Sequence, residues 1–347
     1  MNDQRFNPQS VGLLAEGVPF PQGASAPDDP RSDDPGACLF TRWPDNPILT
    51  KEALPYPCSG IFNPAAVSLD GETILLARVE DMRGISHLAL CRSQDGVTNW
   101  SVDPVPTFEP DPVKYPEEQW GFHNPRVSWI EERREFAVVY TTHSRWGPQV
   151  SLATTKDFKT FDRWGSILPP GHRDAALFPR RVGGRMAILH RPVIEGRDSS
   201  IWIAFSNDLG HWGDHRMLLE SRQGPWWDGH HVGVCPPPLE TPAGWLVLFY
   251  GAGQQAGRHP LRLGLALLDL DDPRRVIHRS QEWVFGPQAP YERDGHRMGI
   301  IFPCGWVHDE SAGKIRLYYG AARTTVCLAE ANFKELVDYA RSCPPPK

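Results

Sequence analysis

Residues 60–81 read GIFNPAAVSLDGETILLARVED, and this stretch contains the pattern that decides the fold. A short apolar run opens with Phe62-Asn63-Pro64, and the turn Asp70-Gly71 follows it. A strongly apolar run over residues 73–77 comes next, and a third run ends in a polar turn at residues 93–96. Asp-Gly between two apolar runs is a strong signal for an antiparallel hairpin. The stretch therefore predicts a small antiparallel sheet.

The same internal order recurs along the chain. The repeats open around prolines that lie about 54 to 66 residues apart, namely Pro64, Pro125, Pro179, Pro237 and Pro303. Each repeat then has its strongly apolar run, at residues 73–77, 136–140, 186–190, 245–250 and 315–319. Repeats of this size with three or four strands are typical of β-propeller blades. We therefore expect an all-β, five-bladed β-propeller, since a β-sandwich would not repeat one order five times and a β-helix has much shorter repeats.

The two ends of the chain differ from the repeats. Residues 1–40 include a Pro- and Asp-rich stretch at 27–35 without apolar periodicity, so we expect a poorly structured leader outside the propeller. Residues 41–347 are expected to form a single propeller domain. Residues 328–341 predict a helix, with Phe333, Leu336, Val337 and Ala340 on one side.

Composition excludes several classes of function. The 347 residues carry 36 Lys and Arg against 42 Asp and Glu, a formal net charge of −6, which does not favour a nucleic-acid partner. No apolar run approaches the roughly 18 residues of a membrane helix, and the first residues do not resemble a secretory signal, so we expect a cytoplasmic protein. Seven scattered cysteines without CxxC spacing argue against disulfides and zinc. We expect no metal, and a homo-oligomer stays open.

Candidate site residues follow from the propeller. The innermost strand of each blade lines the central channel, so polar residues near the repeat openings are expected to face a common axis. These are Asn63, Asn124, Arg126, Asp174, His231 and the turn at residues 297–299. Thirteen tryptophans fit sugar-stacking surfaces as well as β cores.

A set of motifs in chain order resembles one family. They are Phe62-Asn63-Pro64-Ala65, Arg78-Val79-Glu80-Asp81, Asn124-Pro125-Arg126-Val127, the run Asp174-Ala175-Ala176-Leu177-Phe178-Pro179, His190-Arg191-Pro192, the run Gly233-Val234-Cys235-Pro236-Pro237-Pro238, Phe302-Pro303-Cys304-Gly305 and Tyr318-Tyr319-Gly320-Ala321-Ala322. Together they resemble glycoside hydrolase family 130, the β-mannoside phosphorylases and β-mannosidases, from about residue 45 to residue 340.

The resemblance implies a five-bladed propeller that cleaves β-linked mannosides with inversion. Phosphate, or water in the hydrolases, attacks the anomeric carbon, and one Asp donates a proton through the 3-hydroxyl of the sugar. The partner would be a sugar or oligosaccharide, with no cofactor apart from inorganic phosphate as a co-substrate. Carried over by motif, the sugar-binding candidates are Asn63, Arg78, Arg126 and Arg323, and the phosphate-binding candidates are Arg173, Arg191, His231 and Tyr250.

The chain departs from the family pattern at the acid. The family reads Glu-Asp-Pro-Arg where this chain reads His123-Asn124-Pro125-Arg126, so Asn124 occupies the position of the proton donor. A carboxamide does not donate a proton at neutral pH. His123, with an ordinary pKa of about 6.5, is the first candidate for a replacement acid, and Asp174 is the second.

A second departure concerns charge. Arg323 stands where the family has an Asp that holds sugar hydroxyls, and with Arg78, Arg126, Arg173 and Arg191 it predicts an electropositive site. Arginine forks suit carboxylate and phosphate oxygens, so the sugar itself is expected to carry a negative charge.

Three readings of function stay open at this stage. The first is glycoside cleavage with an altered acid site. The second is a non-catalytic propeller that binds a sugar or sugar phosphate. The third is a propeller glycosidase of the arabinanase or invertase type, which would use Glu80, Asp81 and Asp174, although the surrounding motifs do not match those families.

Overall fold

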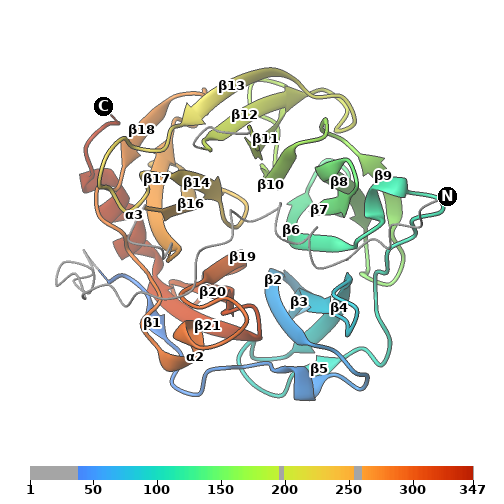
Figure 1. Ribbon diagram of the computed structural model, residues 1–347. Helices are drawn as coiled ribbons and strands as arrows, with labels where there is room; N and C mark the ends of the chain where they lie inside the picture. The colour runs from blue at the N-terminus through green and yellow to red at the C-terminus, as the bar shows by residue number, and fades with distance from the viewer. Residues whose placement is uncertain (1–37, 195–198, 254–259, 347) are drawn as a thin grey trace.

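The chain forms a ring of five β-sheets around a central axis (Figure 1). The computed structural model describes residues 38–194, 199–253 and 260–346. The expected five-bladed propeller is confirmed, while the expected leader lies almost entirely outside the described residues. None of the described helices is long and apolar enough to cross a membrane.

Each blade is an antiparallel meander that runs from the axis outward. Blade 1 contains β2 (Gly60–Leu69), β3 (Glu72–Glu80), β4 (Ser86–Ser93) and β5 (Ser101–Val102). Blade 2 contains β6 (Phe122–Ile130), β7 (Glu135–Ser144), β8 (Gly147–Thr155) and β9 (Asp162–Ser166). Blade 3 contains β10 (His172–Leu177), β11 (Met186–Pro192), β12 (Ile201–Ser206) and β13 (Gly213–Leu219).

The last two blades vary this plan. Blade 4 contains β14 (His231–Val234), β15 (Leu239–Thr241), β16 (Gly244–Ala252), β17 (Arg262–Leu268) and β18 (Val276–Arg279). Its inner strand is divided into β14 and β15, which both pair with β16, because the prolines at 236–238 supply no N–H to the ladder. Blade 5 contains β19 (Ile301–Asp309), β20 (Lys314–Ala321), β21 (Thr325–Asn332) and, as its outer strand, β1 (Thr41–Arg42).

Short helices lie between and after the blades. They are the 3-10 helices η2 (Lys51–Ala53) and η3 (Pro116–Glu118) and the α-helices α2 (Pro290–Arg293) and α3 (Phe333–Ser342). The predicted helix over residues 328–341 was wrong in its first turn, because residues 328–332 belong to β21 and pair with β20. Asn332 caps α3, since its side chain accepts a hydrogen bond from the Glu335 N–H at 3.1 Å.

Five hydrophobic clusters hold the blades together, one in each gap between neighbours. In β3, Leu75 and Val79 pack toward blade 5, whereas Ile74 and Leu76 pack toward blade 2. Alternate side chains of a strand point to opposite faces of its sheet. A blade between two others therefore needs apolar residues on both faces, which explains the continuous apolar runs in the sequence.

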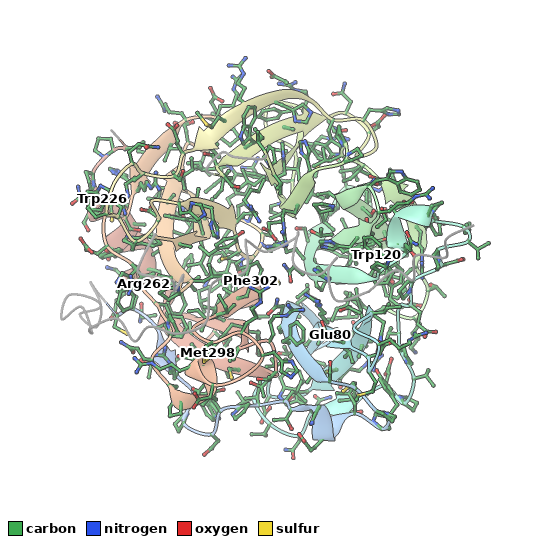
Figure 2. All side chains as sticks on the ribbon, in the orientation of Figure 1. Glu80, Trp120, Trp226, Arg262, Met298 and Phe302 are labelled. Atoms are coloured by element: carbon green, nitrogen blue, oxygen red, sulfur yellow. The ribbon has the colours of Figure 1, made fainter. Side chains whose placement is uncertain are left out.

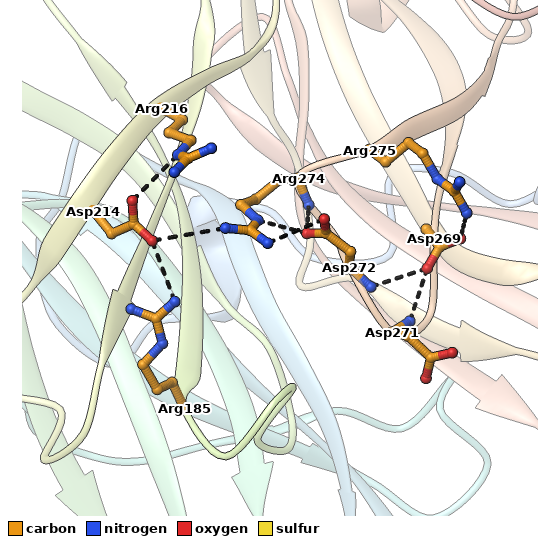
Figure 3. Close-up of polar contacts among 8 residues, drawn as sticks. All are labelled: Arg185, Asp214, Arg216, Asp269, Asp271, Asp272, Arg274 and Arg275. Carbon is orange, nitrogen blue, oxygen red and sulfur yellow. Dashed lines mark hydrogen bonds and ion pairs between the residues drawn. The ribbon is translucent and has the colours of Figure 1, made fainter.

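Charged side chains connect neighbouring blades at the surface. Arg274, in the β17–β18 turn, lies between Asp214 of blade 3 and Asp272 of its own turn (Figure 3). Its Nε is 2.6 Å from Asp272, and its Nη1 is 3.9 Å from Asp214. These groups are largely exposed, so such pairs contribute little to stability, and the apolar clusters carry most of the packing.

We expect the closing strand to depend on Arg42. Arg42 of β1 binds the buried carboxylate of Glu292 through Nε and Nη2, both at 2.8 Å. Arg42→Ala leaves this carboxylate buried without its cation. The free energy of unfolding, measured with urea, should therefore fall by about 3 kcal/mol. Arg83→Ala, which removes the exposed partner of Asp81, should change stability by less than about 1 kcal/mol. Equal losses in the two variants would contradict this account of the closure.

Candidate functional site

The inner strands of blades 1, 2 and 3 present one polar residue each at the same position. Each strand has a bulge there, and Asn63, Asn124 and Asp174 adopt left-handed φ values of 48°, 52° and 49°. Asn and Asp tolerate this conformation better than other residues with a side chain. Asn63 Nδ2 donates to Asn124 Oδ1 at 2.8 Å, and Asn124 Nδ2 donates to Asp174 Oδ1 at 3.4 Å. The bulges thus join three blades by a line of side chains.

Asp174 is a buried carboxylate surrounded by arginines. Arg191 donates to its Oδ2 from Nε at 3.0 Å and from Nη2 at 2.8 Å, and Arg173 Nε lies 3.7 Å from the same oxygen. Tyr250 donates its hydroxyl to Oδ2 at 2.7 Å, and Arg126 Nη2 is 3.8 Å from Oδ1. Burial alone would raise the pKa of Asp174, but the three guanidinium groups hold it well below its ordinary value. Asp174 is therefore ionised, and the expectation that it serves as a replacement acid does not suit this environment.

Arg126 connects blade 2 with blade 4 across the axis. Its Nε donates to the Cys235 carbonyl at 2.6 Å, and its Nη2 donates to the Val234 carbonyl at 2.7 Å. Its Nη1 donates to the Asn124 carbonyl at 2.9 Å. All three guanidinium nitrogens thus donate hydrogen bonds to backbone carbonyls. The contacts of Arg126, which was predicted to bind sugar, therefore hold blades 2 and 4 together.

Arg78 and Arg323 share one carboxylate at the edge of blade 1. Arg323 Nη2 lies 2.8 Å from Glu80 Oε2, and Arg78 Nη2 lies 3.2 Å from the same atom. Both guanidinium groups also lie near the Phe62 ring, at 5.7 and 4.8 Å from its centroid. Figure 2 shows Glu80 over the strands of blade 1. The sequence analysis named Glu80 only for the third reading, as a carboxylate of an arabinanase or invertase type of site, and did not predict its pairing with Arg78 and Arg323.

His123 stacks on His143 of β7, with ring centroids 4.0 Å apart. Burial lowers the pKa of His123 well below its usual range, and Arg78, His143, Arg323 and Arg173 lower it further. The imidazole is therefore neutral at pH 7, and its Nδ1 is a buried atom without a hydrogen-bond partner in the described structure. A neutral imidazole is a weak proton donor, so His123 does not suit the acid role that the sequence suggested.

The predicted phosphate-binding residues fall into two groups. Arg173, Arg191 and Tyr250 come together around Asp174. His231, at the start of β14, is farther out, with its ring centroid 6.0 Å from that of Tyr250. Among the residues that the structure describes, no group of three His, Cys, Asp or Glu side chains is arranged to hold a metal ion.

The fold and the axial site define a five-bladed propeller with an arginine-rich polar centre. The family model described as beta-1,4-mannooligosaccharide phosphorylase matches residues 44–342. The chain therefore belongs to glycoside hydrolase family 130, and the resemblance stated from its motifs is confirmed.

Several relatives cover nearly the whole chain. The beta-1,4-mannooligosaccharide phosphorylase of Ruminococcus albus is 33% identical over 330 residues, which cover 92% of this chain and 97% of the relative. The 1,2-beta-oligomannan phosphorylase of a Thermoanaerobacter species is 31% identical and is matched over 85% of this chain and 98% of its own length. The solved structure of beta-1,2-mannobiose phosphorylase from Listeria innocua with beta-1,2-mannobiose has a TM-score of 0.79 at 27% identity, covering 87% of this chain and 99% of that one.

Three histidines of blade 3 form a second cluster that the sequence did not indicate. His190 Nδ1 lies 3.0 Å from His172 Nδ1, and His190 Nε2 lies 3.2 Å from His215 Nδ1. The residues come from three different strands, so their approach depends on strand register. Burial, together with the smaller effects of His172 and His215, lowers the pKa of His190 to about 2.

This cluster predicts a loss of stability in acid. The folded chain keeps His190 neutral, whereas the unfolded chain takes up a proton below about pH 6.5. Stability should therefore fall as the pH drops from 7 to 5, by up to about 2 kcal/mol for this residue. His190→Gln should reduce the slope of unfolding free energy against pH, whereas His211→Gln, at an exposed position, should not. An unchanged slope in the first variant would contradict this role.

Proposed function

We propose that this chain binds a β-linked mannoside together with inorganic phosphate and transfers the mannosyl group to phosphate with inversion. A phosphate oxygen would form the new bond to the anomeric carbon while the glycosidic C–O bond breaks. The products would be an α-mannosyl phosphate and the released sugar, whose oxygen takes up a proton. The activities named for the relatives support this proposal.

The observation that carries the proposal is the cluster around Asp174. Arg126, Arg173 and Arg191 bring three guanidinium groups to one buried place around Asp174. An excess of buried positive charge attracts an anion, and guanidinium groups suit phosphate oxygens. Asn63 and Asn124 lie directly beside this cluster, where they would bind the hydroxyls of the sugar.

Asn124 determines how fast such a reaction can be. Its Nδ2–H is directed to Asp174 and its Oδ1 accepts from Asn63, which are the contacts that a protonated Asp would make in the same place. The amide therefore preserves the shape of the site without a transferable proton. We propose that the leaving oxygen takes its proton from phosphate or water, at a lower rate than with a side-chain acid.

A second candidate function is sugar binding without turnover. Two observations favour it, the amide at position 124 and the neutral imidazole of His123 beside it. The scaffold and the anion cluster would then hold a mannoside or a mannose phosphate as a ligand.

Phosphate accounts for the excess of positive charge better than a charged sugar does. Arg323, on which the expectation of an anionic sugar rested, pairs with Glu80 at 2.8 Å. Glu80 also lies 3.2 Å from Arg78, so this side of the site has its own carboxylate. We therefore propose a neutral mannoside as the sugar and phosphate as the anion.

Asn124→Asp should increase the phosphorolysis of β-1,4- or β-1,2-mannobiose by about 10²-fold, because general acid catalysis is worth roughly 10²–10⁴-fold. Ionised Asp174 at 3.4 Å would raise the pKa of the new carboxyl and keep it protonated near neutral pH. The release of mannose 1-phosphate in the presence of phosphate measures phosphorolysis, and the release of mannose in its absence measures hydrolysis.

The matched control is Asn63→Asp, which makes the same change in the corresponding left-handed position of blade 1. It should not increase the rate. If Asn124→Asp folds normally and gains nothing, the chain does not follow the family's chemistry, and sugar binding without turnover becomes the better account.

Arg173→Gln should weaken phosphate binding about tenfold or more, because it removes one of the three guanidinium groups that surround the proposed anion position. Arg323→Gln should leave phosphate affinity within about twofold, since that guanidinium is engaged by Glu80. Isothermal titration with inorganic phosphate measures both. If both variants bind phosphate equally weakly, the anion does not bind at the cluster around Asp174.

A further inference from the structure

The hairpin between β7 and β8 exposes a tryptophan at the end of blade 2 where the axial site lies. Ser144 pairs with Gly147, so Arg145 and Trp146 form the tip. The Trp146 side chain is 49% exposed, although it is the largest apolar group a protein can bury. An exposed indole on an ordered hairpin offers a large flat ring that can pack against the face of a ligand.

The base of this hairpin is fixed to the candidate site. His143, two residues before Arg145, stacks on His123, the neighbour of Asn124. The His143 carbonyl accepts from the Trp120 N–H at 2.8 Å, and the His143 N–H donates to the Gly121 carbonyl at 3.2 Å. These bonds tie the hairpin to the segment that leads into β6. Trp146 therefore has a defined position beside the site, on the same blade as Asn124.

The tip combines the two groups that hold a pyranose ring. The Arg145 guanidinium lies 4.5 Å from the centroid of the Trp146 ring, a cation–π contact that orients the indole. In the described part of the chain no aromatic ring packs against Trp146. An indole face suits the C–H face of a sugar, and guanidinium N–H groups suit the hydroxyls at its edge.

We propose that Trp146 and Arg145 bind the sugar on the leaving-group side of the bond to be cleaved. This inference rests on the proposed function, in which Asn63 and Asn124 hold the reacting mannosyl residue. On this proposal the next pyranose of a β-linked chain extends from there toward the hairpin, which leaves blade 2 at the end that carries Asn124. Trp146 thus selects oligosaccharides over the monosaccharide and does not take part in the chemistry.

The test compares sugars of different length in binding titrations. Wild-type chain should bind β-1,4- or β-1,2-mannobiose more tightly than mannose in the presence of phosphate. Trp146→Ala should weaken the binding of the disaccharide about five- to tenfold, which is the contribution of one aromatic contact. The affinity for mannose should stay unchanged. Trp146→Tyr should restore most of the affinity, because it keeps a flat apolar ring. In turnover assays the loss should appear in KM, with kcat nearly constant.

The matched control is Trp129→Ala. Trp129 is 38% exposed and lies at the opposite end of β6, so its removal should affect neither sugar. If wild-type chain binds disaccharides and Trp146→Ala binds them equally well, or loses mannose to the same extent, this inference is overturned while the proposed function stands. If wild-type chain binds none of these sugars, with or without phosphate, both are overturned.

Discussion

The contact between Asp174 and its three arginines is the constraint on which the centre of the propeller depends. Arg126, Arg173 and Arg191 would repel one another at the axis without this carboxylate, and the carboxylate would be costly to bury without them. The same contacts join blades, since Asp174 and Arg191 lie in blade 3, Arg126 in blade 2 and Tyr250 in blade 4. The packing of these three blades and the formation of the arginine cluster around Asp174 therefore depend on each other. The contacts that build this cluster are also contacts between blades.

The bulges explain why the residue types around the axis are so restricted. Each bulge needs a residue that adopts the left-handed conformation and also carries a polar side chain. Asn and Asp meet both requirements best. Gly320 of β20 makes room for the first of them, because a Cβ at this position would lie 2.0 Å from Asn63 Oδ1. An Asp-to-Asn exchange at position 124 satisfies every structural requirement of the site. The Asn124 amide donates one hydrogen bond and accepts another, as a protonated Asp would, so the bulge accommodates either residue.

The architecture of the propeller was easier to predict from the sequence than the contacts between its side chains. The apolar runs identified the second strand of every blade because each run is buried on both faces. The helix start at 328 was wrong because apolar alternation in β21 resembles a helical pattern until the pairing with β20 is known. Asn63, Asn124 and Asp174 were found through their motifs. The pairing of Arg323 with Glu80 and the carbonyl contacts of Arg126 join residues far apart in the sequence, so only strand register and blade order could show them.

The pairing of β1 with β21 affects how the protein folds during its synthesis on the ribosome. Thr41 pairs with Glu330, so the outer strand of blade 5 is made before the other four blades and its partner after them. Early blades can collapse locally as they emerge, but contacts between such distant residues form late and carry the entropic cost of closing a long loop. The cluster around Asp174 contains residues of blades 2, 3 and 4. A nascent chain accordingly cannot complete this cluster before blade 4 has been made, and blade 5 is completed later still.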